Sequence, residues 1–488
     1  MEIFAANGVQ FTLLSMAISL VYFVYKYVYN KSSDPKVPRG SDGWPKFGET
    51  LHFVMASRMG KPEGFVQSRM AKHSEDVFKS RLLGEDMAVL CGAAGNKLLF
   101  SGHNKIVTNW WPSTMKKSFM FPSTVKNSIK DESAILRSFL PEFLKPESLQ
   151  HYIPIMDAMA KDHVAQEWNP HDQVKVFPMS KKYTFALACK LFLSIDDEEQ
   201  VEKLAHPFSL VTAGFFALPV NFPGTTFYKA QKGGEMIREM LLDIIVKKRV
   251  QLNLERLDKT SLPAAPDMAT RMLLSVDENG TPMHEKDISN KIIGLLIASH
   301  DTTSSAITSV FNYLAMFPHI YNQVLQEQME VAKAKSPGEL LNWEDLKKMK
   351  YSWNVACEAM RLQPPAGGAF REVISEFTFA GFTIPKGWKA YWSVHSTHKN
   401  PKYFPNPEKF DPTRFEGNGP APYSYVPFGG GPKMCPGKEY ARLEVLTFIH
   451  NVVTKFKWEK LFPDEEFTYN PIPIPLKDLP VRLTAHQN

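Results

Sequence analysis

The pattern of apolar and polar positions predicts a mainly α-helical chain with a small β part. Residues 287–317 contain no proline and are rich in apolar residues, which predicts one long, largely buried helix. Ile320, Val324 and Leu325 continue the apolar pattern at helical spacing. Residues 376–394 predict short strands around a turn at Gly381, with 384–388 read as one of these strands. Another helix is predicted over 437–456, after a stretch at 400–431 that is dense in Pro and Gly and therefore irregular.

The amino-terminal segment predicts a membrane anchor. Residues 9–28 are apolar, with Lys26 as their only charge, and a helix needs roughly 20 such residues to cross a bilayer. Glu2 precedes the run, and Lys31 and Lys36 follow it, which places the rest of the chain in the cytosol. The alternative is a cleaved signal peptide, but the run lacks a basic segment before it and a small-residue cleavage site after it.

The organisation that we expect has three parts. Residues 1–30 form the anchor, and residues 31–48, which are rich in Pro and Gly, form a stiff linker. Residues 49–488 form one catalytic domain, because no second linker or repeat interrupts them. The net charge of +6 is dispersed among acidic residues, so no nucleic acid partner is expected.

The four cysteines are scattered, and none forms a Cys-x-x-Cys pair, which argues against a zinc site or a disulfide framework. We read Cys91, Cys189 and Cys357 as small buried apolar residues. Cys435 differs, because it follows the glycine-rich segment 428–431 and precedes a predicted helix. Glycines allow the backbone to approach a flat cofactor, and a helix N-terminus favours an anionic sulfur.

Pro436 suits the first position of the helix that follows, since it has no N–H to leave unpaired. Two alternatives to a thiolate ligand remain. The segment could be a glycine turn that contains a cysteine by chance. Cys435 could also be a catalytic nucleophile, although no histidine partner can be assigned from the sequence.

The segment from Phe428 to Gly437 resembles the haem-binding signature of the cytochrome P-450 superfamily. The resemblance implies the fold of that family, with a long central helix over haem b and the cysteine loop beneath it. It implies that Cys435 is the axial ligand of the haem iron and that Phe428 belongs to the cofactor site. Lys433 stands where the family usually has arginine; it can still meet a haem propionate, as a point charge.

The resemblance also implies roles for charged residues that could not be assigned from their spacing alone. Glu358 and Arg361 are one helical turn apart, and Arg414 follows downstream; the matching residues of the family form a buried ion triad behind the haem. Arg371 and Arg137 match positions that contact haem propionates in relatives, although a lone arginine is more often a surface residue.

Residues 298–303 resemble the oxygen-activating motif of the same family. In that motif an acid and an alcohol, here Asp301 and Thr302, relay protons toward the haem. Ser299 departs from the glycine that is common at its position, which puts the local groove geometry in question.

Residues 340–354 and 415–423 carry a resemblance to one plant branch of the family, the triterpenoid oxidases. It implies a pentacyclic or tetracyclic triterpene substrate, with oxidation of the carbon 28 methyl of a β-amyrin-type skeleton to the acid as the best interpretation. Another ring position, a taxoid-like diterpenoid or a steroid are alternatives. The small residues 366–369 would leave room over the haem, and Phe215, Phe216, Leu218, Val220 and Phe222 suit either an apolar entrance or core.

No Gly-x-Gly-x-x-Gly fingerprint opens a βαβ unit, so NADPH is expected to act only through a separate NADPH–cytochrome P-450 reductase, at the endoplasmic reticulum membrane. A basic docking face and an ordinary solvated surface both fit Lys433, Lys438, Arg442, Lys455 and Lys457. The rival functions are a haem-thiolate isomerase or dehydratase, which needs no external electrons, and a non-catalytic haem carrier.

Overall fold

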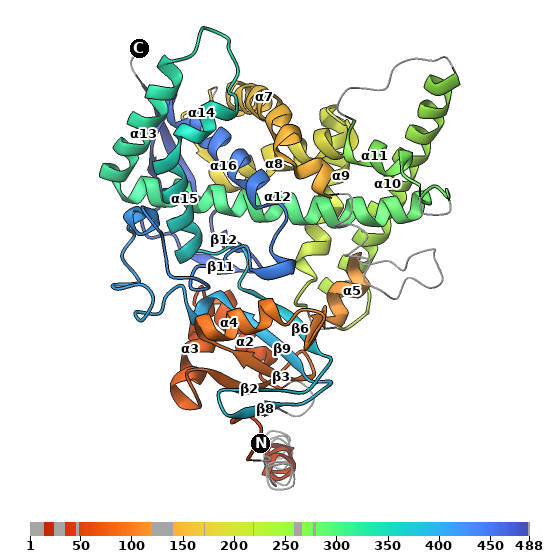
Figure 1. The fold of residues 1–488 in the computed structure, drawn as a ribbon, viewed down its shortest axis with the longest axis vertical. Helices are drawn as coiled ribbons and strands as arrows, with labels where there is room; N and C mark the ends of the chain where they lie inside the picture. The colour runs from red at the N-terminus through yellow and green to blue at the C-terminus, as the bar shows by residue number, and fades with distance from the viewer. Residues whose placement is uncertain are drawn as a thin grey trace, which may run out of the picture.

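The computed structural model describes residues 14–23, 35–44, 48–119, 140–169, 171–217, 219–257, 266–276 and 280–486, with side chains of 254–257 left aside. A helical region and a smaller sheet region lie at opposite ends of the molecule, and one long helix crosses between them (Figure 1). This arrangement confirms the prediction of a mainly α-helical chain with a small β part.

Most of the described residues belong to helices. The α-helices are α2 (Thr50–Arg58), α3 (Pro62–Lys72), α4 (Gly92–Ser101), α5 (Ser113–Phe119), α7 (Pro146–His163), α8 (Val176–Leu193), α9 (Glu198–Ala213), α10 (Thr226–Leu257), α11 (Met268–Leu274), α12 (Glu285–Met316), α13 (Pro318–Lys333), α14 (Trp343–Lys348), α15 (Lys350–Leu362) and α16 (Lys438–Val453). A π-helical segment, η1 (Val164–Trp168), continues α7, and short 3₁₀ helices are η2 (Val394–Ser396), η3 (Pro412–Phe415) and η4 (Gly431–Lys433).

The strands form one larger sheet and three small ones. The larger sheet has the order β1-β2-β3-β9-β6-β4, a second sheet has the order β10-β13-β5, and β7–β8 and β11–β12 are hairpins. The bounds are β1 (Gly40–Ser41), β2 (Val77–Leu82), β3 (Glu85–Leu90), β4 (Val107–Asn109), β5 (Gln173–Lys175), β6 (Gly368–Val373), β7 (Phe377–Phe379), β8 (Phe382–Ile384), β9 (Lys389–Ser393), β10 (Phe456–Lys460), β11 (Phe467–Tyr469), β12 (Pro473–Pro475) and β13 (Pro480–Ala485).

The long helix α12 confirms the prediction for residues 287–317. It begins after His284, whose side chain accepts a hydrogen bond from the Lys286 N–H, and it ends before Pro318, which cannot extend it. Most of its side chains are buried, and it packs against α8, α10, α15 and α16. It therefore lies at the centre of the fold (Figure 1).

Three local predictions need correction. The segment 384–388 is not a strand, because Pro385 to Gly387 forms the turn between β8 and β9, with Gly387 at a φ of 90°. Pro436 does not occupy the first helical position, since α16 begins two residues later, at Lys438. The same helix ends at Val453 rather than at residue 456, where β10 starts.

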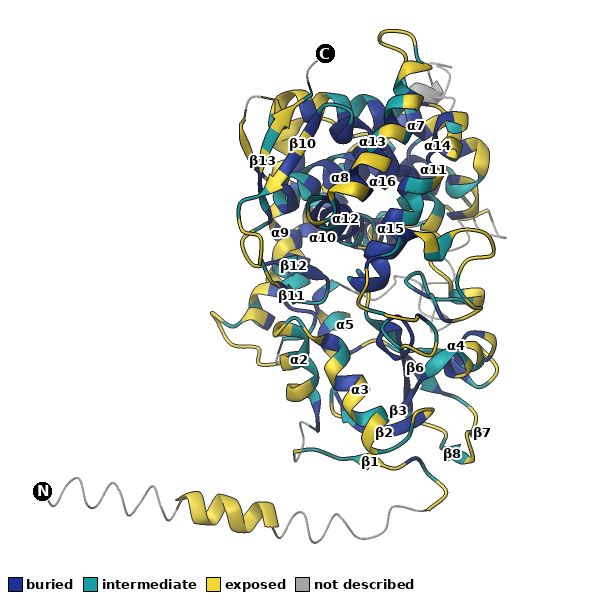
Figure 2. Ribbon diagram, turned by 90° about the vertical axis from the view of Figure 1, so that its left-hand side faces the viewer, coloured by how far each residue is buried: buried dark blue, intermediate teal, exposed yellow. Residues whose placement is uncertain are grey.

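The predicted anchor is described only over residues 14–23. These residues form a helix whose side chains are all exposed, outside the folded body (Figure 2). Within the described part of the chain, no helix is both long and apolar enough to cross a membrane. Inside the predicted linker, β1 pairs in parallel with β2, with Gly40 opposite Lys79.

Candidate active site

The cysteine loop lies between η4 and α16. The backbone N–H of Cys435 donates to the Phe428 carbonyl at 2.8 Å, which closes the loop. Cys435 is exposed, and α16 begins three residues later, so its sulfur lies near the N-terminal end of that helix. A helix N-terminus stabilises negative charge and favours a thiolate.

The glycines of this loop are required by close packing on α4. A Cβ at Gly430 would lie 2.4 Å from a ring carbon of Phe100, and a Cβ at Gly431 would lie 2.4 Å from the Phe100 carbonyl oxygen. Gly431 also has a φ of 64°, which favours glycine. The loop is therefore fixed against Phe100 and holds Cys435 in a defined place.

The other three cysteines are buried, as we predicted. Burial raises the pKa of Cys189 and of Cys357 to about 12, and it raises the pKa of Cys91 further. These thiols stay protonated at neutral pH. Among the four cysteines, Cys435 is the one whose sulfur is available as a thiolate ligand.

The structure brings Glu358, Arg361 and Arg414 together. Arg361 binds Glu358 through two hydrogen bonds of 2.7 and 2.8 Å, and both side chains are completely buried. The Arg414 Nε lies 3.3 Å from the same carboxylate. The backbone N–H of Asp411 donates to Glu358 at 2.8 Å, so this carboxylate is surrounded by donors.

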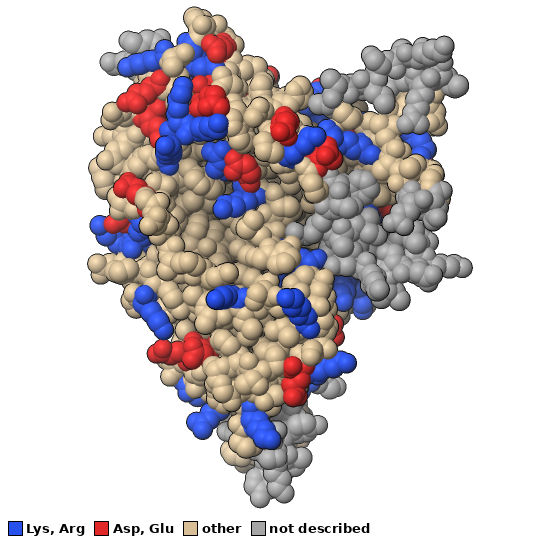
Figure 3. Space-filling model, in the orientation of Figure 1, with Lys and Arg blue, Asp and Glu red and all other residues tan. Residues whose placement is uncertain are grey.

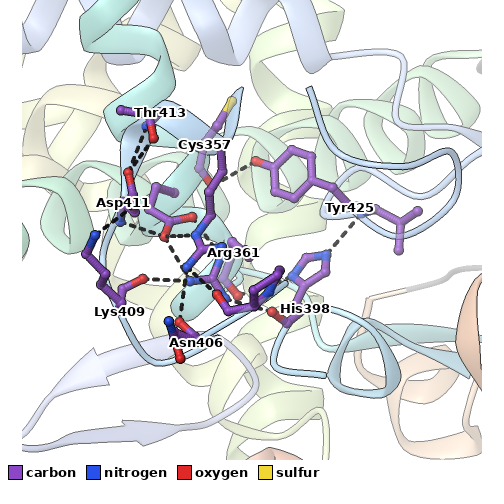
Figure 4. Close-up of polar contacts among 12 residues, drawn as sticks. Cys357, Arg361, His398, Asn406, Lys409, Asp411, Thr413 and Tyr425 are labelled. Carbon is purple, nitrogen blue, oxygen red and sulfur yellow. Dashed lines mark hydrogen bonds and ion pairs between the residues drawn. The ribbon is translucent and has the colours of Figure 1, made fainter. Parts of the chain in front are cut away.

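Arg361 also ties distant segments together (Figure 4). It donates to the His398 carbonyl at 2.7 Å and to the Lys409 carbonyl at 3.2 Å. The His398 ring accepts from the Val426 N–H at 3.0 Å, close to the start of the cysteine loop. The ion cluster thus connects α15 with the irregular stretch that leads to Cys435.

A cavity of about 550 Å³ lies beside α12. This volume is within the range of roughly 300–1,000 Å³ that is common for small-molecule sites. Its wall is mainly apolar and includes Phe53, Val54, Trp110, Trp111, Met115, Phe119, Phe177, Phe215, Phe216, Ile297, Phe370, Ile472 and Ile474. Residues 366–369 line it as predicted.

The predicted apolar entrance is divided. Phe215 and Phe216 line the cavity, whereas Val220 and Phe222 are exposed on the surface nearby in the chain. Leu218 lies outside the described residues.

Two polar residues of α12, Asp301 and Thr302, line the cavity as a pair. The Thr302 hydroxyl donates to the Ala298 carbonyl at 2.7 Å, so its oxygen can still accept a hydrogen bond from the cavity. Ser299 turns back to the Leu296 carbonyl at 3.3 Å, and α12 runs as one continuous helix through this position. The serine is therefore accommodated within regular helix.

Asp301 is held by two basic side chains, Lys181 and His300. Its carboxylate lies 2.9 Å from the Lys181 ammonium and 3.3 Å from the His300 ring. Burial by itself raises the pKa of Asp301, but His300 and Lys181 outweigh burial and hold this pKa below its usual range. Asp301 is therefore ionised at neutral pH.

Sequence reasoning missed Lys181. It belongs to α8, which is mostly buried and apolar, and its ammonium reaches the cavity wall while its side chain stays 29% exposed. A lysine on a mostly buried helix was the available signal. The β11–β12 hairpin was missed as well, although residues 469–472 line the cavity.

The predicted cofactor-binding residues lie in separate parts of the structure. Arg371 lies on β6 in the cavity wall, is 8% exposed and donates to the Phe370 carbonyl at 2.7 Å. Lys433 ends η4, two residues before Cys435, and Phe428 packs against the main core. Arg137 lies outside the described residues.

The five basic residues of the predicted docking face do not form one cluster. Lys433, Lys438 and Arg442 lie near the start of α16, but Lys455 and Lys457 follow its other end. The 16 residues of α16 between these two groups correspond to about 24 Å of helix. Basic and acidic side chains are intermixed on the face drawn in Figure 3, and the centre of that face is largely uncharged.

These residues fit a haem group. Cys435 supplies an available sulfur beside a helix N-terminus, and Arg371 supplies a buried cation in the cavity wall. A guanidinium in a cavity wall can bind an anion, and carboxylates such as the haem propionates match its forked donors. A long helix over a cavity, together with a cysteine loop, defines the class of haem-thiolate oxygenases.

The comparisons with known proteins agree with this class. The family model for cytochrome P-450 matches residues 38–481. The structure resembles that of the retinoic acid-bound cyanobacterial CYP120A1, with a TM-score of 0.79 and 31% sequence identity, over 92% of this chain and 99% of that chain. The chain belongs to the cytochrome P-450 family.

The similarity to curated plant proteins extends over the full length. The chain is 55% identical to a β-amyrin 6-beta-monooxygenase of Solanum lycopersicum, over 97% of this chain and 98% of the relative. It is 52% identical to β-amyrin 28-monooxygenases of Vitis vinifera, with 100% of both chains covered, and of Medicago truncatula, with 98% of both covered.

Membership in the family confirms the predicted fold, the haem cofactor and the class of enzyme. The protein is a haem-dependent oxidoreductase that incorporates oxygen and takes its electrons from a reductase. The rival predictions of an isomerase and of a non-catalytic carrier are therefore set aside.

Proposed function

We propose that this enzyme oxidises the carbon 28 methyl group of a β-amyrin-type triterpene to the carboxylic acid, through the alcohol and the aldehyde. The observation that carries the proposal is the full-length similarity to the Vitis vinifera and Medicago truncatula 28-monooxygenases. The largely apolar cavity beside α12 suits a rigid hydrocarbon skeleton, because burial of such a surface drives its binding.

A second candidate is hydroxylation at the 6β position. It is favoured by the Solanum lycopersicum relative, which has a higher identity to this chain than the two 28-monooxygenases. Both reactions start from the same skeleton and differ in which carbon faces the reacting centre. The orientation of the substrate in the cavity decides between them.

We propose that five residues form the haem-binding site. Cys435 would supply the sulfur ligand of the iron, Phe428 closes the cysteine loop through its backbone carbonyl, and Arg371, Lys433 and Arg137 would bind the propionates. When bound, the haem supplies the redox centre at which dioxygen is activated for attack on a C–H bond. The ion cluster of Glu358, Arg361 and Arg414 has the structural role of holding the cysteine loop against α15.

Asp301 and Thr302 handle protons on the cavity side. The ionised Asp301 can accept a proton, and the Thr302 oxygen can bind a water molecule in the cavity, since its own proton is committed to Ala298. Lys181 extends from this pair toward solvent. The three side chains form a route along which a proton can move from the surface to the cavity.

We further propose the predicted three-part organisation. Residues 1–30 anchor the protein in the endoplasmic reticulum membrane by a single span. Residues 31–48 link this anchor to residues 49–488, which form the cytosolic catalytic domain. The exposed apolar residues Leu51 and Met55 on α2 and Met59 just after it, together with Val220 and Phe222, support contact of the body with lipid. Phe53 and Val54 of the same helix line the cavity, so a lipophilic substrate can reach it from the membrane.

The proposal is tested by expressing the full-length chain in yeast with a plant reductase and a β-amyrin cyclase. The expected products are the carbon 28 alcohol, aldehyde and acid of β-amyrin, formed only when the reductase is present. A 6β-hydroxylated product would instead establish the second candidate. If β-amyrin were left unchanged while a cyclase for another skeleton gave an oxidised product, both candidates would be wrong.

A further inference from the structure

A buried carboxyl group on α16 has no hydrogen-bond partner in the described structure. Glu444 is 1% exposed, and neither of its carboxyl oxygens bonds to any described residue. Asp157, another fully buried acid, instead receives hydrogen bonds from the Leu341 N–H at 2.9 Å and the Asn451 amide at 2.7 Å. Buried polar groups are normally paired with protein or with ordered water, so Glu444 requires an explanation.

Hydroxyl groups lie near Glu444. Tyr440 and Thr447 lie one turn before and after it on the same face of α16, and neither hydroxyl has a partner among the described residues. Tyr183 of α8 lies opposite and donates to the Met156 carbonyl at 3.1 Å. Burial raises the pKa of Tyr183 and of Tyr440, and Glu444 lies close enough to act on both of these pKa values.

The polar atoms without partners continue across the neighbouring helices. Ser180, one turn before Tyr183 on α8, has an unpartnered hydroxyl within the described structure. The His163 Nε2 and the Trp168 Nε1, on rings that flank Phe448, have no described partner either. Trp168 belongs to the π-helical segment that continues α7. Helices α7, α8 and α16 lie together in the helical half of the molecule (Figure 1).

No described cation balances Glu444. Burial raises its pKa well above the usual range, and no charged neighbour offsets this effect. The titratable groups that face the cluster are Tyr152, Asp157 and His163 of α7, Tyr183 of α8 and Tyr440 of α16 itself. Lys161 forms an ion pair with Asp157 at 2.8 Å, and this lysine therefore does not neutralise Glu444. An isolated buried carboxylate is costly enough that the group takes up a proton instead.

We propose that the space among Tyr183, Tyr440, Glu444 and Thr447 is an internal water-binding site, in which Glu444 is held as a neutral carboxylic acid. A neutral acid both donates and accepts, and each hydroxyl can do the same, so bridging water molecules satisfy the whole cluster. α16 begins three residues after Cys435. The neutral acid keeps this helix free of an unpaired buried negative charge, which would oppose the arrival of an electron from the reductase.

The protonation state is read by infrared difference spectroscopy on the full-length holoprotein in H₂O and D₂O at neutral pH. The wild type is expected to show the carbonyl band of a protonated carboxylic acid, which shifts in D₂O and is missing in Glu444→Gln. The matched control is Glu439→Gln, which removes an acid of the same helix that pairs with Arg442. This control should lose a carboxylate band and keep the acid band.

Three further measurements need no substrate, and the first two use the wild type alone. A high-resolution crystal structure of the wild type should show ordered water within hydrogen-bond distance of Glu444; a dry site, or a metal cation bound there, would overturn the proposal. If the wild type has no protonated-acid band at neutral pH, the proposal is equally wrong. The haem reduction potential should be unchanged in Glu444→Gln, and a shift to a more positive potential would mean that the acid was ionised.

Discussion

Two buried carboxylates of this protein, Glu358 and Asp301, are both held by cations, yet their surroundings differ. Glu358 is completely buried and receives two short bonds from Arg361, a backbone N–H and the nearby Arg414. Asp301 lines the cavity and is held by Lys181, which reaches solvent, and by His300. The first carboxylate is saturated with donors, and the second remains open on the cavity side.

The difference shows how a structural ion pair and a chemically active one can be told apart. A saturated pair inside the protein cannot exchange protons without leaving a buried charge, which makes it a rigid connection. A carboxylate that is open to a cavity and paired with a partly exposed lysine keeps lone pairs through which it can accept a hydrogen bond or a proton from the cavity. We therefore expect substitutions at the first site to remove the folded protein and substitutions at the second to remove activity.

The largest effect is expected for Arg361→Met, which removes the two short hydrogen bonds to the buried Glu358 and leaves only the longer Arg414 contact and the Asp411 N–H. The free energy of unfolding should fall by roughly 3–5 kcal/mol, and haem incorporation should fail. Denaturant unfolding and the haem-to-protein ratio measure both effects. The control is Arg442→Met, because Arg442 forms the same i, i+3 pair with the more exposed Glu439 and should change stability by less than about 1 kcal/mol.

At the cavity, Thr302→Val keeps the shape of the side chain and removes its hydroxyl. Product formation should fall by about 10²-fold while haem content is kept and NADPH is still consumed, because proton handling and not electron supply is lost. Thr308→Val is the matched control, since Thr308 makes the same bond to its own helix at 2.7 Å but does not line the cavity. If product formation in Thr302→Val were coupled normally to NADPH consumption, the Thr302 hydroxyl would have no role in the proton route.

A smaller effect is expected for Lys181→Met. Lys181 is one of the two groups that hold the pKa of Asp301 down, so without it this pKa should rise toward its usual range and the acid limb of the activity profile should move to higher pH. The pH–rate profile distinguishes this from a structural defect. The neighbouring Lys182→Met, which loses surface pairs with Glu167 and Glu198, should keep the wild-type profile. If both variants had the same profile, Lys181 would have no special role.

A separate test concerns stability in mild acid, which does not depend on either carboxylate site. Burial lowers the pKa of His163, His395 and His450 to about 4, below the usual 6.5. The unfolded chain then binds more protons between pH 6.5 and 4, so stability falls as the pH drops through this window. Each histidine contributes up to ~1.4 kcal/mol per pH unit. Unfolding midpoints that stayed constant from pH 7 to pH 5 would contradict this.

Local patterns were sufficient for the central helix and for the cysteine loop. The proline-free apolar run predicts α12 because burial and the absence of breakers act within the segment itself. Pro436 was misplaced, since the backbone bond from Cys435 to Phe428 and the packing on Phe100 delay the start of α16. That packing joins segments more than 300 residues apart, and no local pattern contains it.

The candidate site was predictable where a motif carries its own chemistry. Asp301, Thr302 and Cys435 lie in recognisable segments, and Glu358 and Arg361 are one turn apart on α15. Lys181 and the hairpin residues 469–472 come to the cavity from other parts of the chain, and only tertiary packing brings them there. The predicted basic docking face stays a prediction; its residues lie toward both ends of α16, because nearness in sequence ignores the length of that helix.

The central claim is that the sulfur of Cys435 binds the haem iron, and the carbon monoxide difference spectrum of the reduced protein tests it most directly. Wild type and the buried-cysteine control Cys357→Ala should both give the thiolate-type spectrum, and Cys435→Ser should lose it. A thiolate-type spectrum in Cys435→Ser, or a wild type purified with no porphyrin, would contradict the account.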